Sequence, residues 1–141
     1  LGDIERLPIT ANVVDVVVSN CVVNLVPNKK AVMAEVYRVL KPNGHFSISD
    51  VVLRGNLPDE LKNDAEMYAG CVAGAIQLEE YLQIISQAGF SNITVQKDRK
   101  ITLPQEILAN YNLQELPADS GIYSVTVYAE KTACDPNRGC C

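Results

Sequence analysis

The feature that most constrains the fold is a nearly continuous β-branched run from Val13 to Ser19, in which only Asp15 and Ser19 are not valine. A nearly continuous apolar run of this length is typical of a parallel strand that is buried on both faces. A helical pattern follows from about Asn28 to Leu40, and an alternating pattern from His45 to Val52 predicts a second strand. A strand, a helix and a strand in this order form a right-handed crossover unit with parallel strands. The sequence therefore predicts an α/β fold.

The remaining pattern predicts one domain over residues 1–131, followed by a flexible, cysteine-containing tail at 132–141. Residues 55–76 interrupt the strand–helix rhythm, and we expect them to form an inserted helical excursion. The further expected elements are a helix at 78–88, a strand near 92–97, a short helix starting near Pro104 and a last strand at 122–131.

The composition argues against several classes of protein. The net charge is −5 and the 12 Lys and Arg residues are scattered, whereas a nucleic-acid-binding protein usually carries a basic stripe. The chain has no apolar run of 18 residues and no signal-peptide pattern. Its five cysteines are an odd number without the spacing of a disulfide framework. These features favour reduced thiols and a cytoplasmic location.

The first residues after Leu1 read as the end of a strand, and no glycine-rich G-x-G-x-x-G turn lies between a strand and a helix. We therefore expect this chain to be the carboxyl-terminal half of a longer domain. The phosphate- or sulfonium-binding half of a cofactor site would then lie upstream. On this interpretation the chain alone is inactive.

Topology also indicates where a ligand would bind. Ligands of open α/β sheets bind beyond the carboxyl ends of the strands, which are predicted at Ser19-Asn20-Cys21 and at Ser49-Asp50. Cys71 lies in the excursion that would fold over the same edge. Thiolates select soft, thiophilic centres, but a single cysteine is more often a small buried hydrophobe. The residues alone leave both interpretations open.

Three strings resemble the downstream motifs of class I methyltransferases, and two further strings resemble the arsenite S-adenosylmethionine methyltransferase family. The general strings are Gly2-Asp3-Ile4-Glu5-x-Leu7-Pro8, Asp15 to Asn20 and Arg38-Val39-Leu40-Lys41-Pro42-x-Gly44. The more specific strings are Ser19-Asn20-Cys21-Val22-Val23-Asn24-Leu25 and Cys71-Val72-Ala73-Gly74-Ala75. The resemblance covers nearly the whole chain up to the tail.

This resemblance implies the carboxyl-terminal half of a Rossmann-like class I methyltransferase fold, a mostly parallel sheet with an antiparallel strand near its end. It implies that Cys21 and Cys71 are catalytic thiolates that bind As(III), together with a cysteine upstream. Asp3 and Ile4 would lie beside the adenine of S-adenosylmethionine, and Asn20 would border the cofactor pocket. The implied reaction is methylation of arsenite, or of thiol-conjugated arsenic, for detoxification.

Two alternatives remain at this stage. One is a class I methyltransferase for a quinone-like or other small organic substrate, in which both cysteines are merely packed. The other is a non-catalytic module that binds a metalloid through its thiols. The arsenic reading also implies a thiol reductant such as glutathione or thioredoxin. Finally, an unprotected edge at Val13 to Ser19 predicts that the chain associates with itself.

Overall fold

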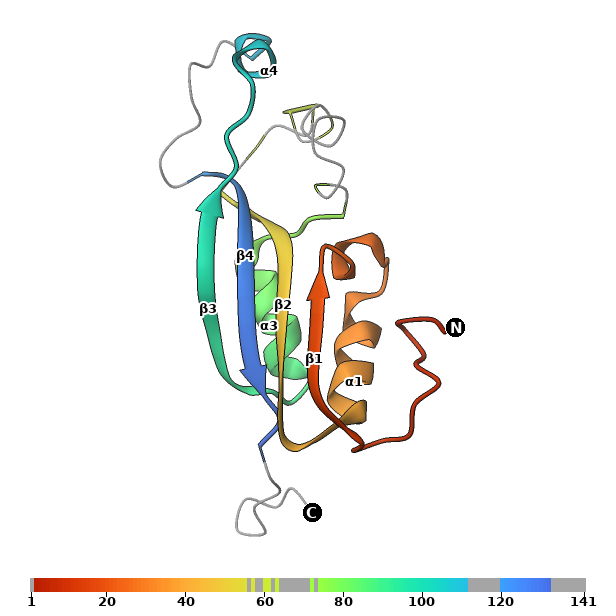
Figure 1. Ribbon diagram of the computed structural model, residues 1–141. Helices are drawn as coiled ribbons and strands as arrows, with labels where there is room; N and C mark the ends of the chain where they lie inside the picture. The colour runs from red at the N-terminus through yellow and green to blue at the C-terminus, as the bar shows by residue number, and fades with distance from the viewer. Residues whose placement is uncertain are drawn as a thin grey trace.

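The computed structural model describes residues 2–55, 57, 60–61, 63, 72, 74–111 and 120–132. In this part of the chain four strands form one sheet in the order β1-β2-β4-β3 (Figure 1). The strands are β1 (Val14–Asn20), β2 (Leu40–Arg54), β3 (Ser91–Lys100) and β4 (Gly121–Glu130).

The directions of the strands confirm the predicted fold class. β1 and β2 are parallel, whereas β4 is antiparallel to both of its neighbours, β2 and β3. Three of the four described strands therefore point the same way, and the antiparallel strand is the last in the chain. The connection from β1 to β2 runs through a short 3₁₀ helix, η1 (Val23–Leu25), and through α1 (Lys29–Val39).

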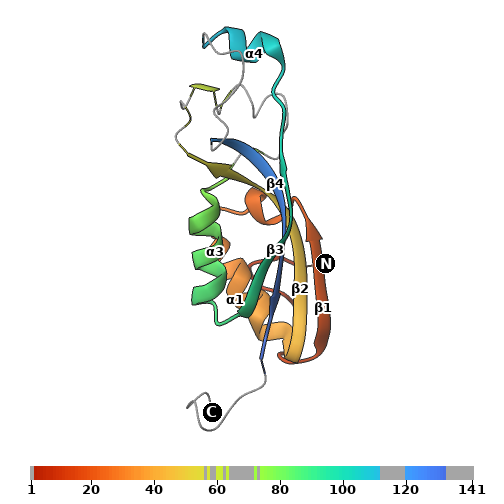
Figure 2. The same cartoon turned by 90° about the vertical axis from the view of Figure 1, so that its left-hand side faces the viewer.

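Helices α1 and α3 (Leu78–Gln87) cover the same face of the sheet, and the short helix α4 (Gln105–Ala109) lies beyond its end (Figures 1 and 2). Glu79 and Glu80 occupy the first turn of α3, where negative charge is favourable, and Gly89 ends the helix with a φ of 109°. Within the described ranges, no helix has the length and apolar character needed to cross a lipid bilayer.

The junction of α1 and β2 differs from the prediction in one respect. Asn28 caps α1 by accepting a hydrogen bond from the Ala31 amide at 3.1 Å, and the helix ends because Leu40 is already extended. The strand begins at Leu40 and not at His45. The Asn43 amide donates to the Lys131 carbonyl at 2.6 Å, so this segment is held against the chain that leaves β4.

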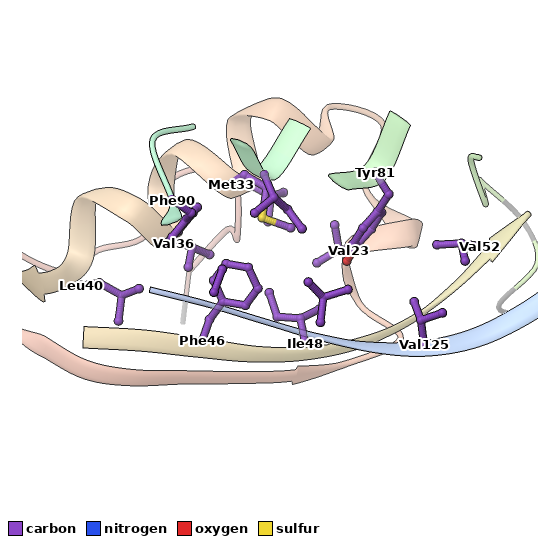
Figure 3. Close-up of a cluster of buried hydrophobic side chains, with 14 of the residues drawn as sticks. Val23, Met33, Val36, Leu40, Phe46, Ile48, Val52, Tyr81, Phe90 and Val125 are labelled. Carbon is purple, nitrogen blue, oxygen red and sulfur yellow. The ribbon is translucent and has the colours of Figure 1, made fainter. Parts of the chain in front are cut away.

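The main core lies between the sheet and the two covering helices (Figure 3). Phe46 of β2 is fully buried there and packs edge-to-face against Phe90 with a centroid distance of 4.7 Å. A second apolar cluster lies at the carboxyl end of β2, where side chains of the excursion meet the segments around α4. It consists of Val51, Leu53, Leu61, Val72, Leu103, Leu108 and Ile122.

The other face of the sheet has no helix over it in the described part of the chain (Figure 2). Val16 is 44% exposed and Val18 is 76% exposed, so the prediction that this strand is buried on both faces is wrong for this chain. The neighbouring strands carry more polar side chains on that face. The hydroxyl oxygens of Ser49 and Thr126 form a hydrogen bond of 2.7 Å. The ring centroids of His45 and Tyr128 lie 5.1 Å apart.

Truncation of Phe46 tests the position of the core. Phe46→Ala removes a buried ring and leaves a cavity between β2 and the covering helices, so we expect the free energy of unfolding to fall by about 3–5 kcal/mol. Leu25→Ala is the control, because Leu25 is 65% exposed. Chemical denaturation followed by circular dichroism measures both variants. A similar loss in the two variants would contradict this description of the core.

Candidate functional site

The chain makes a strained turn as it leaves β1. Cys21 has a φ of 56°, in the left-handed region that L-residues rarely occupy. The other described non-glycine residues with positive φ are asparagines, which tolerate this conformation well: Asn12, Asn43 and Asn92. The Cys21 amide donates to the Ser49 carbonyl at 2.8 Å, and the residue is half-buried. The turn therefore fixes this thiol-bearing residue at the carboxyl end of β1, beside Ser49 of β2.

Asn24 binds the same turn to the next residues of β2. Its side chain is 3% exposed and donates from Nδ2 to the Val51 carbonyl at 2.6 Å. Its backbone N–H donates to the Asp50 carboxylate. Three consecutive residues of β2 therefore accept hydrogen bonds from the turn after β1. They are Ser49, Asp50 and Val51.

Asp50 is the buried charge of this region, with an exposed fraction of 1%. Burial raises its pKa to about 6, although hydrogen bonds from the Val51 and Asn24 amides and from Tyr81, and the charge of Lys29, act in the opposite direction. The Tyr81 hydroxyl lies 3.5 Å from Oδ2 and reaches toward the sheet from α3 (Figure 3). Strand topology predicted that Asp50 lines the crevice, and this is wrong because α3 covers the side chain.

The end of the excursion returns to this turn. Gly74 has a φ of 75°, and a Cβ atom at this position would lie 2.3 Å from the Asn24 carbonyl oxygen. Only glycine therefore fits this conformation and this close approach. Two residues later the Ile76 carbonyl accepts a hydrogen bond from the Leu53 amide at 2.8 Å. A pocket of about 260 Å³ lies here, lined by Asn24, Leu25, Val26, Pro27, Lys29 and Gly74.

The segment that carries Asp3 and Ile4 runs beside α1 and is held by an ion pair of that helix. Glu35 accepts a hydrogen bond from the Leu7 amide at 2.8 Å. Arg38 donates to the carbonyls of Leu7 and Ile9 at 3.1 and 2.8 Å, and its Nε lies 2.7 Å from Glu35 Oε1. The Arg38 guanidinium, helped by the Leu7 amide, lowers the pKa of Glu35 to about 2.

The predicted cofactor residues have different environments. Ile4 is half-buried and packs against the main core, while Asp3 is exposed and accepts the Glu5 amide at Oδ1 at 2.9 Å. Asn20 is exposed at the carboxyl end of β1, directly before Cys21. The Ser19 hydroxyl is buried and has no hydrogen-bond partner among the described residues.

Of the predicted thiolates, Cys21 lies in the turn, whereas Cys71 lies outside the described residues, as do the tail cysteines. Within the described ranges, no three His, Cys, Asp or Glu side chains cluster as metal ligands would. Sequence reasoning missed the role of Asn24 and the burial of Asp50. A signal for Asn24 was present, because it is the one amide side chain within an apolar string, Val22 to Val26.

The known proteins that this chain is similar to are described as methyltransferases. Residues 1–114 match a family model described as a methyltransferase domain. The chain is 38% identical over 137 residues to an arsenite methyltransferase of Halobacterium salinarum, covering 96% of this chain and 34% of that protein. It is 36% identical over 126 residues to an arsenite methyltransferase of Aquipseudomonas alcaligenes, covering 89% and 35%. The chain therefore spans about a third of the length of these curated relatives.

Among solved structures, the chain resembles an arsenic(III) S-adenosylmethionine methyltransferase from Chlamydomonas reinhardtii. The TM-score is 0.76 at 29% sequence identity, and the match covers 93% of this chain and 43% of that chain. The likeness in structure thus extends over the described sheet and helices together.

Removal of the Arg38 side chain tests the attachment of the amino-terminal segment. Arg38→Ala should lower the unfolding free energy at pH 7, because two carbonyls and a carboxylate lose their donor. The pH dependence of the unfolding free energy should change as well. The folded pKa of Glu35 is depressed, so its stabilising contribution is present above about pH 4.5 and is lost as the pH falls toward 2. In Arg38→Ala this acid-dependent loss should shrink.

Denaturation between pH 2 and 7 measures both effects, and Arg99→Ala, which removes an exposed arginine on β3, is the matched control. An unchanged acid profile in Arg38→Ala would show that the ion pair does not set the pKa of Glu35.

Proposed function

Because this chain belongs to the methyltransferase domain family, we propose that the whole protein transfers a methyl group from S-adenosylmethionine to trivalent arsenic. The observation that carries the proposal is the place of Cys21, whose strained turn fixes a thiol at the carboxyl end of the parallel pair β1 and β2. The names of the relatives support arsenic as the substrate and favour it over a quinone-like molecule. They also favour an enzyme over a binding module.

The proposed substrate site consists of Cys21 and Cys71 with As(III) bound between their thiolates. Soft thiolates suit this centre, and two of them leave its lone pair open for reaction. The contact between Gly74 and Asn24 supports a shared site. Each of these residues follows one of the two cysteines by three positions, and three residues span at most about 11 Å. The covalent chain thus limits the separation of the two thiols.

The described residues also fit one side of the proposed cofactor. Asp3 and Asn20 offer exposed polar groups, and the buried Ser19 hydroxyl has no partner among the described residues. When bound, S-adenosylmethionine supplies an electrophilic methyl group. In the proposal Asp3 and Ile4 hold the adenine side, Asn20 borders the pocket, and the segment bound by Arg38 keeps them in place.

We further propose that the excursion at 55–76 binds the substrate and excludes water from it, with the tail at 132–141 acting as a separate flexible segment. Thiol chemistry of this kind needs a reducing compartment and a thiol reductant such as glutathione or thioredoxin. We therefore propose a cytoplasmic protein that takes arsenite or thiol-conjugated arsenic.

Replacement of single cysteines tests the substrate site. We expect Cys21→Ser and Cys71→Ser each to weaken arsenite binding by at least about tenfold, or roughly 1.4 kcal/mol, because one arsenic–sulfur bond is lost. Cys140→Ser is the matched control and should bind as the unmodified chain does. Isothermal calorimetry with sodium arsenite under reducing conditions measures the affinities. Equal losses in all three variants would indicate nonspecific thiol capture and would overturn the proposed site.

Self-association follows from the exposed edge of the sheet. In the described part of the chain β1 pairs with β2 alone, and Val16 and Val18 are exposed on the uncovered face. We propose that the 141-residue chain forms a dimer or larger species through Val13 to Ser19. Analytical ultracentrifugation should show this species, and Val18→Lys should shift it toward monomer. Gln96→Lys, on the exposed side of β3, is the control. A monomeric parent chain would contradict the proposal.

A further inference from the structure

We propose that Asp50 and Asn24 are positioning residues that hold the Cys21 turn in its reactive conformation. The inference rests on the proposed function only in so far as Cys21 binds arsenic. Neither residue needs to contact the arsenic, because each acts through the backbone of the turn. The buried amide and carboxylate would thus be part of the substrate site, although α3 separates Asp50 from the crevice.

The conformation of Cys21 needs support from its surroundings. A cysteine at a φ of 56° is strained relative to an extended or helical residue, and such a conformation persists only where surrounding bonds impose it. The Cys21 amide supplies one of these bonds, to the Ser49 carbonyl at 2.8 Å. Bonds on the far side of the turn, to Asp50 and Val51 of β2, act together with this one.

Buried groups hold the far side of the Cys21 turn. The Asn24 side chain donates to the Val51 carbonyl at 2.6 Å, and the Asn24 backbone N–H donates to Asp50. Asp50 also faces the Tyr81 hydroxyl from α3 and the positive charge of Lys29 from α1. Hydrogen bonds at sites this deeply buried are costly to break, since the groups left behind cannot reach water. The turn is therefore fixed at both ends.

Burial at position 50 would favour an apolar side chain over a carboxylate. Burial raises the pKa of Asp50 to about 6, which means that the folded chain destabilises its ionised form. What the carboxylate provides is two acceptor oxygens, one of them 3.3 Å from the Val51 amide. Asparagine retains one such acceptor and can donate to Tyr81, whereas alanine retains none. This difference allows a direct test.

The experiment compares Asp50→Asn, Asp50→Ala and Asn24→Ala in the full 141-residue chain. The first readout is the rate of iodoacetamide alkylation at Cys21, followed by mass spectrometry of its peptide. The second is arsenite affinity by calorimetry, with Cys21→Ser in parallel. We expect Asp50→Ala and Asn24→Ala to change the alkylation rate by roughly fivefold and to weaken arsenite binding by a similar factor, because the competent turn is less populated. Asp50→Asn should stay within about twofold of the parent chain in both readouts.

Alkylation rates in Asp50→Ala and Asn24→Ala that match the parent chain would overturn the positioning role. So would an Asp50→Asn variant as impaired as Asp50→Ala. If Asp50→Ala does not fold, Asn24→Ala alone decides, because it keeps the backbone bond to Asp50 and loses only the amide bond to Val51. Unchanged arsenite binding in Cys21→Ser would refute the proposed substrate site, while the alkylation rates would still test the positioning of the turn.

Discussion

Backbone pairing along both edges of β2 is the constraint on which the rest of the structure depends. On one edge β2 pairs in parallel with β1, from Asn20 and Ser49 at the carboxyl end back toward α1. On the other edge it pairs with β4 over ten consecutive residues. The strand thus fixes the crossover through α1, the turn after β1 and the antiparallel return. A change of register in β2 would move Phe46 out of the core and would separate Ser49 from Cys21 at the same time.

Polar groups join these elements at both ends of the sheet. Lys131, just after β4, donates from Nζ to the carbonyls of Tyr37 and Leu40 at 2.8 and 2.9 Å, so it satisfies carbonyl groups at the end of α1. At the opposite end of the sheet, buried Asn24 and Asp50 join η1 to β2. At one end of the sheet, the partly buried Lys131 ammonium thus binds carbonyls at the end of α1. At the other end, a buried carboxylate and a buried amide hold the turn after β1.

The sequence predicted those elements whose causes are local. The β-branched run from Val13 to Ser19 and the helical pattern from about Asn28 to Leu40 both act within a few residues, and each forms the predicted element, β1 and α1. The burial of Asp50 was not predictable in this way, because it depends on α3, which lies about 30 residues further along the chain. The left-handed conformation of Cys21 also escaped prediction, since it is imposed by bonds to a different strand. The convergence of Cys21 and Cys71 remains a prediction.

If Cys21 and Cys71 bind arsenic together as proposed, the close packing of Gly74 on Asn24 affects how tightly they bind it. Once one thiol has captured arsenic, capture by the second becomes an intramolecular step, whose strength depends on the effective concentration of that thiol. A contact that holds the two chain segments together keeps this concentration high without any change in thiol acidity. A bulkier residue at position 74 would push the segments apart and would lower it. In the proposed site, a glycine that carries no donor atom for arsenic would therefore contribute to the affinity in addition to the cysteines.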